Sequence, residues 1–199
     1  MSLHYLALGD SYTIGEAVPA ACRWPQQLVA QLRRHGVAVD DPRIIAVTGW
    51  TTDELAAGMD ATRPVPPYDL VTLQIGVNNQ YRARAAGRYR GEFRRLLQRA
   101  IGLAGGHAGH VVTVSIPDWG VTRFGLTDPR GSARIGAELD VYNAIARDET
   151  SRAGARWVDI TGISRRHPEL VATDGLHPSA TQYTRWVAVI EPLVRAALR

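Results

Sequence analysis

Five short aliphatic runs alternate along the chain with segments of helical period, and this alternation limits the possible folds more than any other feature. Short, continuously apolar runs are typical of strands that are buried on both faces of a parallel sheet. The five runs cover residues 5–8, 43–47, 70–75, 110–116 and 156–160. Because strands that alternate with helices connect by right-handed crossovers, the sequence predicts the α/β class, as a three-layer α/β/α sandwich.

The segments between these runs carry apolar residues at the spacing of one helix face. The clearest example places Tyr89, Phe93 and Leu96 on one stripe. Other helices are predicted over residues 24–35, 132–152 and 179–198. Proline lacks the amide hydrogen that a helix interior needs, so Pro192 is expected to kink or divide the last helix.

The length and composition are those of one globular domain. With 199 residues, 45% of them hydrophobic and 21% charged, the chain has room for a single core, and we expect one domain over residues 1–199. The one cysteine, Cys22, excludes an intramolecular disulfide and a thiolate zinc cluster, which points to a reducing compartment. Neither a long apolar span nor a signal peptide is evident, so we expect a cytoplasmic protein without a membrane partner.

The basic charge of the chain comes from arginine alone. The formal net charge is +4, and the sequence contains no lysine. Nucleic-acid binding is one explanation of such charge, but no groove of interleaved basic and aromatic residues accompanies the arginines. The densest group, between Arg82 and Arg99, overlaps a helix whose other face is apolar. We therefore expect a solvated helix face and no nucleic-acid partner.

Polar residues follow four of the predicted strands, at the positions where α/β proteins of this kind bind their ligands. The segments are GDSYTIG at residues 9–15, TGW at 48–50, GVNN at 76–79 and DGLH at 174–177. If the strand order is 2-1-3-4-5, the first three strands are neighbours, so Ser11, Gly49 and Asn78 converge at one edge. The loop before His177 is long enough to bring that residue to the same edge.

These segments resemble the conserved blocks of the SGNH, or GDSL-like, hydrolases. GDSYTIG resembles the first block, Gly49 stands at the glycine of the second, GVNN resembles the Gly-x-Asn-Asp block and DGLHP the Asp-x-x-His block. The resemblance implies the flavodoxin-like SGNH hydrolase fold, with a five-stranded parallel sheet in the order 2-1-3-4-5. One position departs from the pattern: Asn79 replaces aspartate, which puts the support of its loop in doubt and leaves Asn78 in place.

Chemistry and resemblance assign the same roles to the candidate catalytic residues. A serine hydroxyl needs an adjacent base, and a neutral imidazole oriented by a carboxylate serves as one. We expect Ser11 to be the nucleophile, His177 the base and Asp174 its orienting carboxylate. The oxyanion donors are then the amides of Ser11 and Gly49 and the side chain of Asn78. The predicted function is a serine esterase for small-molecule carboxylic esters with short acyl or acetyl groups, without cofactor or metal.

Residues beside these positions are candidates for a substrate pocket. They are Tyr12, Trp50, Asn79, Trp119 and Phe124. The residues Trp50, Trp119 and Phe124 fit core packing equally well. The acyl preference, the alcohol part of the ester and the oligomeric state stay open, and lipase, thioesterase and carbohydrate deacetylase activities all belong to the class.

Each assignment has a structural alternative. Ser11 fits the N-cap of a helix, Asn78 and the Asp174–Gly175 pair fit turns, and Gly49 fits a left-handed hinge. Asp10 is expected to hold its loop by hydrogen bonds to backbone amides.

Two other functions are compatible with some of these residues. A metal-dependent phosphoesterase is suggested by the oxygen and nitrogen ligands at the strand ends, although their set holds only one histidine. The third possibility is a non-catalytic protein that binds acylated or sugar ligands.

Overall fold

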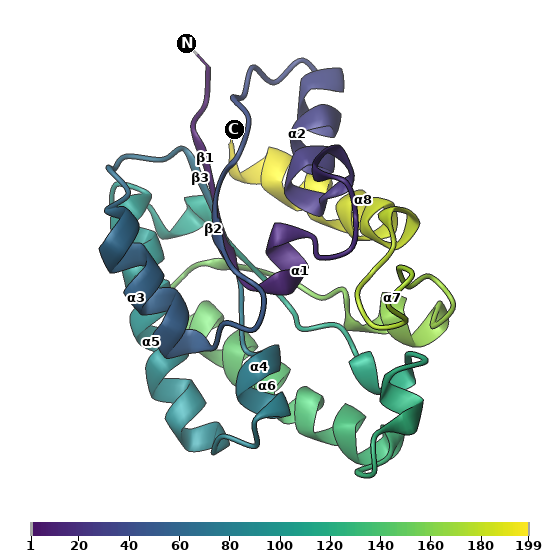
Figure 1. Cartoon of the computed structure of the whole chain (residues 1–199). Helices are drawn as coiled ribbons and strands as arrows, with labels where there is room; N and C mark the ends of the chain where they lie inside the picture. Colours follow the sequence, from purple (N-terminus) through teal and green to yellow (C-terminus); the bar gives the residue numbers. More distant parts are fainter. Residues whose placement is uncertain (1, 199) are drawn as a thin grey trace.

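Five parallel strands form the centre of the structure, a computed structural model that describes residues 2–198 (Figure 1). Within this range the strand order is β2-β1-β3-β4-β5, and each neighbouring pair is parallel. The strands are β1 (Tyr5–Gly9), β2 (Arg43–Ala46), β3 (Leu70–Gln74), β4 (Val111–Val114) and β5 (Arg156–Val158). The predicted fold class and strand order are confirmed.

The central strands are rich in apolar residues because both of their faces are covered, and β3 also buries the polar Thr72 and Gln74. All residues of β1 and β3 are buried, and Leu8 pairs in register with Ile45 on one side and Leu73 on the other. The predicted runs extend past the ends of β4 and β5. Ile116, for example, leaves the ladder and donates its amide to Asn143 Oδ1 at 2.8 Å.

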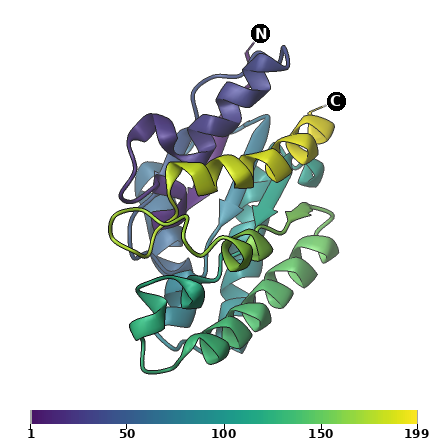
Figure 2. The ribbon, with the colours of Figure 1, turned by 90° about the vertical axis from the view of Figure 1, so that its right-hand side faces the viewer.

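Helices cover both faces of the sheet (Figures 1 and 2). Helices α2 and α8 pack together on one face, and α3, α5 and α6 pack on the other. The longer helices are α2 (Trp24–Arg34), α3 (Thr52–Thr62), α5 (Ala86–Leu103), α6 (Ser132–Arg152) and α8 (Ala180–Ala197). Short helices follow strand ends: α1 (Ser11–Ile14), α4 (Val77–Tyr81) and α7 (Thr161–Arg166). Four 3-10 turns connect the rest: η1 (Ala20–Cys22), η2 (Ala108–His110), η3 (Trp119–Val121) and η4 (Gly125–Thr127).

Helix α8 runs through Pro192 as one element, so a division of this helix at the proline is not found. Its inner face buries Tyr183, Trp186 and Ile190 completely. The loss of one backbone hydrogen bond at proline costs about 3 kcal/mol. Burial of a large apolar side chain contributes about 1.5–3 kcal/mol, so several of them outweigh that cost and keep the helix intact.

The carboxyl ends of β1 and β3 lead directly into α1 and α4, and the end of β2 leads into the loop before α3. Because the strands are parallel and adjacent, these three connections lie at the same edge of the sheet, where Figure 1 labels α1 and α4. None of the described helices combines the length and the apolar character needed to cross a membrane.

Candidate active site

Ser11 is the first residue of α1, and the residue before it caps that helix. The Asp10 carboxylate accepts the Tyr12 amide at 3.1 Å, and the Asp10 carbonyl accepts the amides of Thr13 and Ile14. The cap is therefore supplied by Asp10, as expected for a residue that holds this loop. Ser11 is not the N-cap, and its side chain lines a pocket instead.

Asp10 carries an unusual carboxyl group. The residue is only 1% exposed. This burial raises its pKa to about 7, against the opposing effect of the hydrogen bond from the Tyr12 amide. Asp10 thus titrates near neutral pH although it lies next to the residue that opens α1.

His177 and Asp174 form a local pair in the loop between α7 and α8. Nδ1 of His177 lies 2.6 Å from Oδ2 of Asp174, and Oδ1 of Asp174 accepts the amides of Leu176 and His177. Partial burial of Asp174 disfavours its charge, but these hydrogen bonds outweigh burial and hold its pKa below the ordinary value. A charged carboxylate therefore holds the imidazole in one orientation.

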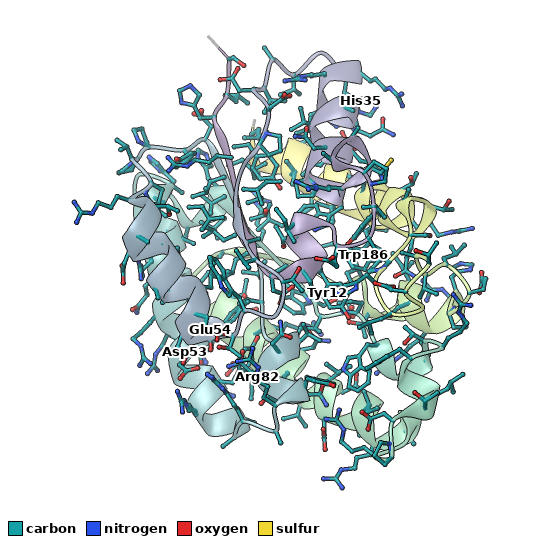
Figure 3. The ribbon with its side chains drawn as sticks, viewed as in Figure 1. Tyr12, His35, Asp53, Glu54, Arg82 and Trp186 are labelled. Carbon is teal, nitrogen blue, oxygen red and sulfur yellow. The ribbon has the colours of Figure 1, made fainter. Side chains whose placement is uncertain are left out.

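Ser11 and His177 line the same pocket from opposite ends of the sequence. Among residues 2–198, no hydrogen bond joins Ser11 Oγ to the imidazole; such contacts are often long before substrate binds. The Tyr12 ring stands edge-on to His177, with ring centroids 5.8 Å apart. The same ring also contacts Trp186 of α8, with ring centroids 6.2 Å apart; both side chains are labelled in Figure 3. Tyr12 therefore links the imidazole to the packed core of α8.

Three hydrogen-bond donors border this pocket. Within the described residues, the amides of Ser11 and Gly49 donate to no other backbone group. Gly49 adopts a φ of 86°, a conformation that favours glycine. Asn78 Nδ2 donates to the Trp50 carbonyl at 2.9 Å, which uses one of its two hydrogens and leaves the other. The three donors can serve a negatively charged oxygen.

The pocket is small and mostly apolar. Its volume is about 210 Å³. Seven of the predicted residues line it: three are polar, three are aromatic and one is Gly49. The lining residues are Ser11, Tyr12, Thr48, Gly49, Val77, Asn78, Tyr81, Trp119, Phe124, Leu176 and His177.

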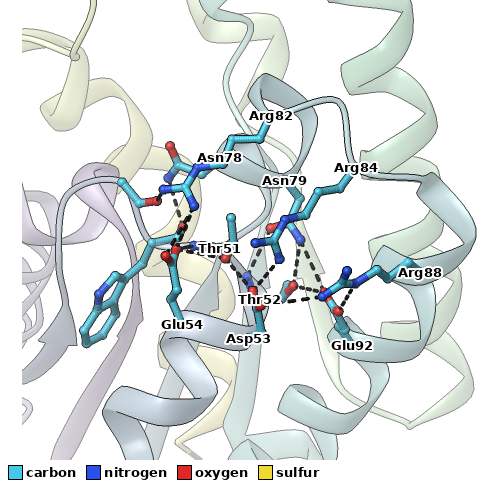
Figure 4. Close-up of polar contacts among 12 residues, drawn as sticks. Thr51, Thr52, Asp53, Glu54, Asn78, Asn79, Arg82, Arg84, Arg88 and Glu92 are labelled. Carbon is cyan, nitrogen blue, oxygen red and sulfur yellow. Dashed lines mark hydrogen bonds and ion pairs between the residues drawn. The ribbon is translucent and has the colours of Figure 1, made fainter.

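The structure places two predicted pocket residues, Trp50 and Asn79, outside the pocket. The Trp50 indole covers Gly58 of α3, where an added Cβ would lie 2.2 Å from the ring. Asn79 is fully buried: its Oδ1 accepts the Thr52 amide at 3.1 Å, and its Nδ2 donates to Thr52 Oγ1 at 2.7 Å (Figure 4). Both expectations are wrong because these side chains turn towards α3 and α5, away from the pocket.

Comparison with known families decides the class of the protein. A model of the GDSL-like Lipase/Acylhydrolase family matches residues 7–185. The chain belongs to the GDSL-like lipase/acylhydrolase family. The resemblance found in the four sequence blocks is thereby confirmed, and this acylhydrolase is an ester hydrolase by class.

Solved structures share the fold of this acylhydrolase at low sequence identity. TesA is 16% identical, with a TM-score of 0.76, over 98% of this chain and 99% of its own. The psychrotrophic esterase EstA from Pseudoalteromonas sp. is 14% identical, with a TM-score of 0.74, over 99% of both chains. Axe2, an acetyl xylan esterase from Geobacillus stearothermophilus, is 17% identical, with a TM-score of 0.72, over 96% of this chain and 94% of its own. No curated protein sequence matches the chain.

Four pocket residues of the acylhydrolase escaped the sequence analysis. Thr48 and Leu176 directly precede Gly49 and His177, so their place in the same loops is the signal that points to them. Val77 and Tyr81 flank Asn78 on α4, and residues three and four apart share a helix face. If α4 is predicted as a helix, Tyr81 falls on the same face as Asn78 and becomes a candidate for the pocket.

Aromatic side chains form one wall of the acylhydrolase pocket. The Trp119 ring contacts Tyr81 at 5.5 Å and Phe124 at 6.1 Å between centroids. Its Nε1 donates to Gln80 Oε1 at 2.9 Å, and the Arg130 guanidinium lies 5.0 Å above the indole. These contacts fix the wall before substrate binds.

Of the residues that would suggest a phosphoesterase, Asn78 and His177 line the pocket of the acylhydrolase, whereas Asp10 and Asn79 do not. Asp10 caps α1 and Asn79 bonds to Thr52, while Asp174 bonds to His177. Within residues 2–198, no three His, Cys, Asp or Glu side chains form a group that could hold a metal ion.

Proposed function

We propose that this acylhydrolase cleaves carboxylic esters through an acyl-enzyme on Ser11. One observation carries the proposal: Ser11 lines the same pocket as His177, whose Nδ1 lies 2.6 Å from the Asp174 carboxylate. A carboxylate in that position selects the tautomer with a proton on Nδ1 and leaves Nε2 free as a base.

The first half of the reaction forms the acyl-enzyme. Ser11 Oγ attacks the carbonyl carbon of the ester while His177 Nε2 takes the hydroxyl proton. The carbonyl oxygen becomes negatively charged and accepts hydrogen bonds from the amides of Ser11 and Gly49 and from Asn78. When the tetrahedral intermediate collapses, the ester C–O bond breaks and the alcohol leaves with the proton from His177.

The second half releases the acid. Water attacks the acyl carbon and gives a proton to His177, and the same three donors stabilise the second oxyanion. Collapse of this intermediate breaks the bond to Ser11 Oγ, which recovers its proton from the imidazole. The products are a carboxylic acid and the free enzyme.

We propose short acyl groups as the preferred substrates because of the pocket size. An apolar cavity of about 150 Å³ accommodates benzene. The pocket of about 210 Å³ therefore suits an acetyl group, a short chain or a single ring. Axe2, which shares the fold, is an acetyl xylan esterase, which agrees with a small acyl group.

Hydrolysis of p-nitrophenyl acetate and butyrate tests the nucleophile directly. We expect Ser11→Ala to abolish turnover and to abolish labelling by a fluorophosphonate probe, since only an activated serine reacts with it. Thr13→Ser, in the same helix but outside the pocket lining, is the matched control and should keep both signals. Turnover that persists in Ser11→Ala would exclude this mechanism, and a wild-type protein that neither turns over nor labels would be a binding protein.

A further inference from the structure

We propose that Arg82 is a positioning residue that keeps the loop of residues 48–51, here called the oxyanion loop, in its catalytic shape. The inference rests on the proposed function, since it concerns the amide of Gly49 in that loop. Arg82 follows α4 directly, and its own amide donates to the Asn78 carbonyl at 3.0 Å. It is therefore built onto the turn that carries another proposed oxyanion donor.

The guanidinium bridges the oxyanion loop to the start of α3. Arg82 Nη2 donates to the Gly49 carbonyl at 2.7 Å, and Nη1 lies 3.2 and 3.3 Å from the two carboxylate oxygens of Glu54 (Figure 4). Glu54 in turn accepts the Thr51 amide at 2.8 Å. The planar guanidinium of Arg82 thus contacts both the Gly49 carbonyl and the Glu54 carboxylate, which caps α3.

Side chains hold three successive residues of the oxyanion loop. The Gly49 carbonyl accepts from Arg82, the Trp50 carbonyl accepts from Asn78, and the Thr51 amide donates to Glu54. These contacts leave the Gly49 amide without a backbone acceptor among the described residues. In Gly49 itself, Arg82 holds the carbonyl, and the amide stays available to a ligand in the pocket.

Gly49 needs such a support more than another residue would. Glycine explores a wide range of φ and ψ, and Gly49 holds a φ of 86°. A rotation about these angles would turn its amide away from the oxyanion. Since donors must be aimed before charge develops, an anchored carbonyl preserves the aim of the amide in the same residue.

The ion pair between Arg82 and Glu54 is exposed to solvent, so we expect Arg82 to affect catalysis more than stability. The side chains of Arg82 and Glu54 are 43% and 40% exposed, and exposed ion pairs contribute little to stability. Arg84 offers a matched control because it pairs with Asp53 nearby but does not contact Gly49. Arg84 is 21% exposed, so its loss should cost at least as much stability as the loss of Arg82, and both costs should be small.

The test compares Arg82→Ala with Arg84→Ala in the hydrolysis of p-nitrophenyl acetate. We expect Arg82→Ala to lower kcat about tenfold with little change in KM, a smaller loss than the 10²–10³ that follows removal of a donor itself. Arg84→Ala should keep kcat. Both melting temperatures should stay within about 4 °C of the wild-type value. Unchanged kcat in Arg82→Ala, or an equal loss in both variants, would overturn the proposal.

A trifluoromethyl ketone inhibitor, which forms a tetrahedral oxyanion adduct with a serine, gives the second readout. Its affinity for Arg82→Ala should fall in parallel with kcat/KM, because it uses the same donors as the transition state. Unchanged affinity would overturn the proposal. If Arg82→Ala melts far below the wild type, Arg82→Lys decides: one ammonium cannot reproduce the fork, so kcat should still fall, and wild-type kcat would refute the inference.

The two proposals fail in different ways. Loss of turnover in Ser11→Ala together with full activity in Arg82→Ala would remove only the role of Arg82. Turnover that survives in Ser11→Ala would remove the acyl-enzyme itself.

Discussion

The asparagine at position 79 replaces the aspartate that the family pattern has there, and its surroundings explain the choice. Asn79 Nδ2 donates to Thr52 Oγ1 at 2.7 Å and lies 3.4 Å from Glu92 Oε2. Asn79 is fully buried and Glu92 is 9% exposed. An aspartate at this position would lose the donor and bring a second carboxylate next to the first. The amide is therefore the partner that suits Glu92.

We expect Asn79→Asp to destabilise the protein by about 1–3 kcal/mol, because it leaves a buried hydroxyl without its donor and sets two like charges together. Glu92→Gln should recover part of this loss in the double variant, since the amide restores a donor and removes one charge. A double-mutant cycle measures this coupling. It compares the denaturant midpoints of the wild type, both single variants and the double variant. Additive effects, with no recovery in the double variant, would contradict the coupling of these two positions.

At the scale of elements, α1 shows how a four-residue helix is held at the end of a buried strand. Its cap, Asp10, lies below the surface, while the Tyr12 carbonyl accepts the Tyr183 hydroxyl of α8 at 3.0 Å. Gly15 ends the helix in the left-handed conformation, with φ 71°. A helix of four residues is not stable by itself. Contacts with the strand, the cap and the distant helix α8 therefore stabilise α1.

The buried cap predicts a pH dependence of stability. Burial raises the pKa of Asp10 to about 7, whereas an unfolded chain returns it to the ordinary value of about 3.9. Between these values the folded state binds more protons, so this residue stabilises the fold at low pH and loses that contribution as the pH rises towards 7. Asparagine can also cap a helix but does not titrate.

Melting temperatures of the wild type and Asp10→Asn from pH 4 to pH 7 measure this contribution. We expect the variant to gain stability relative to the wild type as the pH rises. The measured quantity is the difference in melting temperature between the wild type and Asp10→Asn. This difference cancels the effect of Asp174, Asp53 and Asp128, whose lowered pKa values change stability in the opposite direction. A constant difference over this range would show that Asp10 does not titrate there.

On the scale of the whole molecule, segments far apart in the chain form one small pocket. Five parts of the chain contribute to its lining: helix α1, the loop after β2, helix α4, the η3–η4 segment and the loop before α8. Under the proposed function, its aromatic wall would limit the length of the acyl group, and Phe124 of this wall is 39% exposed. Removal of that ring should open the pocket to longer chains.

A series of p-nitrophenyl esters tests the size limit. The wild type should show its highest kcat/KM between acetate and hexanoate and much lower values for laurate, because a longer chain leaves the pocket. Phe124→Ala should shift the preference towards octanoate. Leu126→Ala is the matched control, since Leu126 lies in the same turn, is 69% exposed and does not line the pocket. The same chain-length profile in all three proteins would mean that this wall does not set the preference.

Local patterns in the sequence determined the class of the fold. The aliphatic runs and the helical stripes depend on residues that are near neighbours in the chain, and burial on both faces of a parallel sheet requires such runs. The four polar segments also indicated the edge of the site, because parallel strands bring their carboxyl ends together. Together with the resemblance to the SGNH blocks, this geometry makes Ser11, Gly49, Asn78 and His177 the candidates that the sequence predicts.

Only the tertiary structure decided which side chains face the pocket. Trp50 covers Gly58 and Asn79 binds Thr52, whereas Tyr81 turns inwards. Likewise, only the fold brings the guanidinium of Arg82 to the carbonyl of Gly49. The physical reason is that a side chain is oriented by hydrogen bonds and packing with residues distant in the chain, and no local period of the sequence contains those partners.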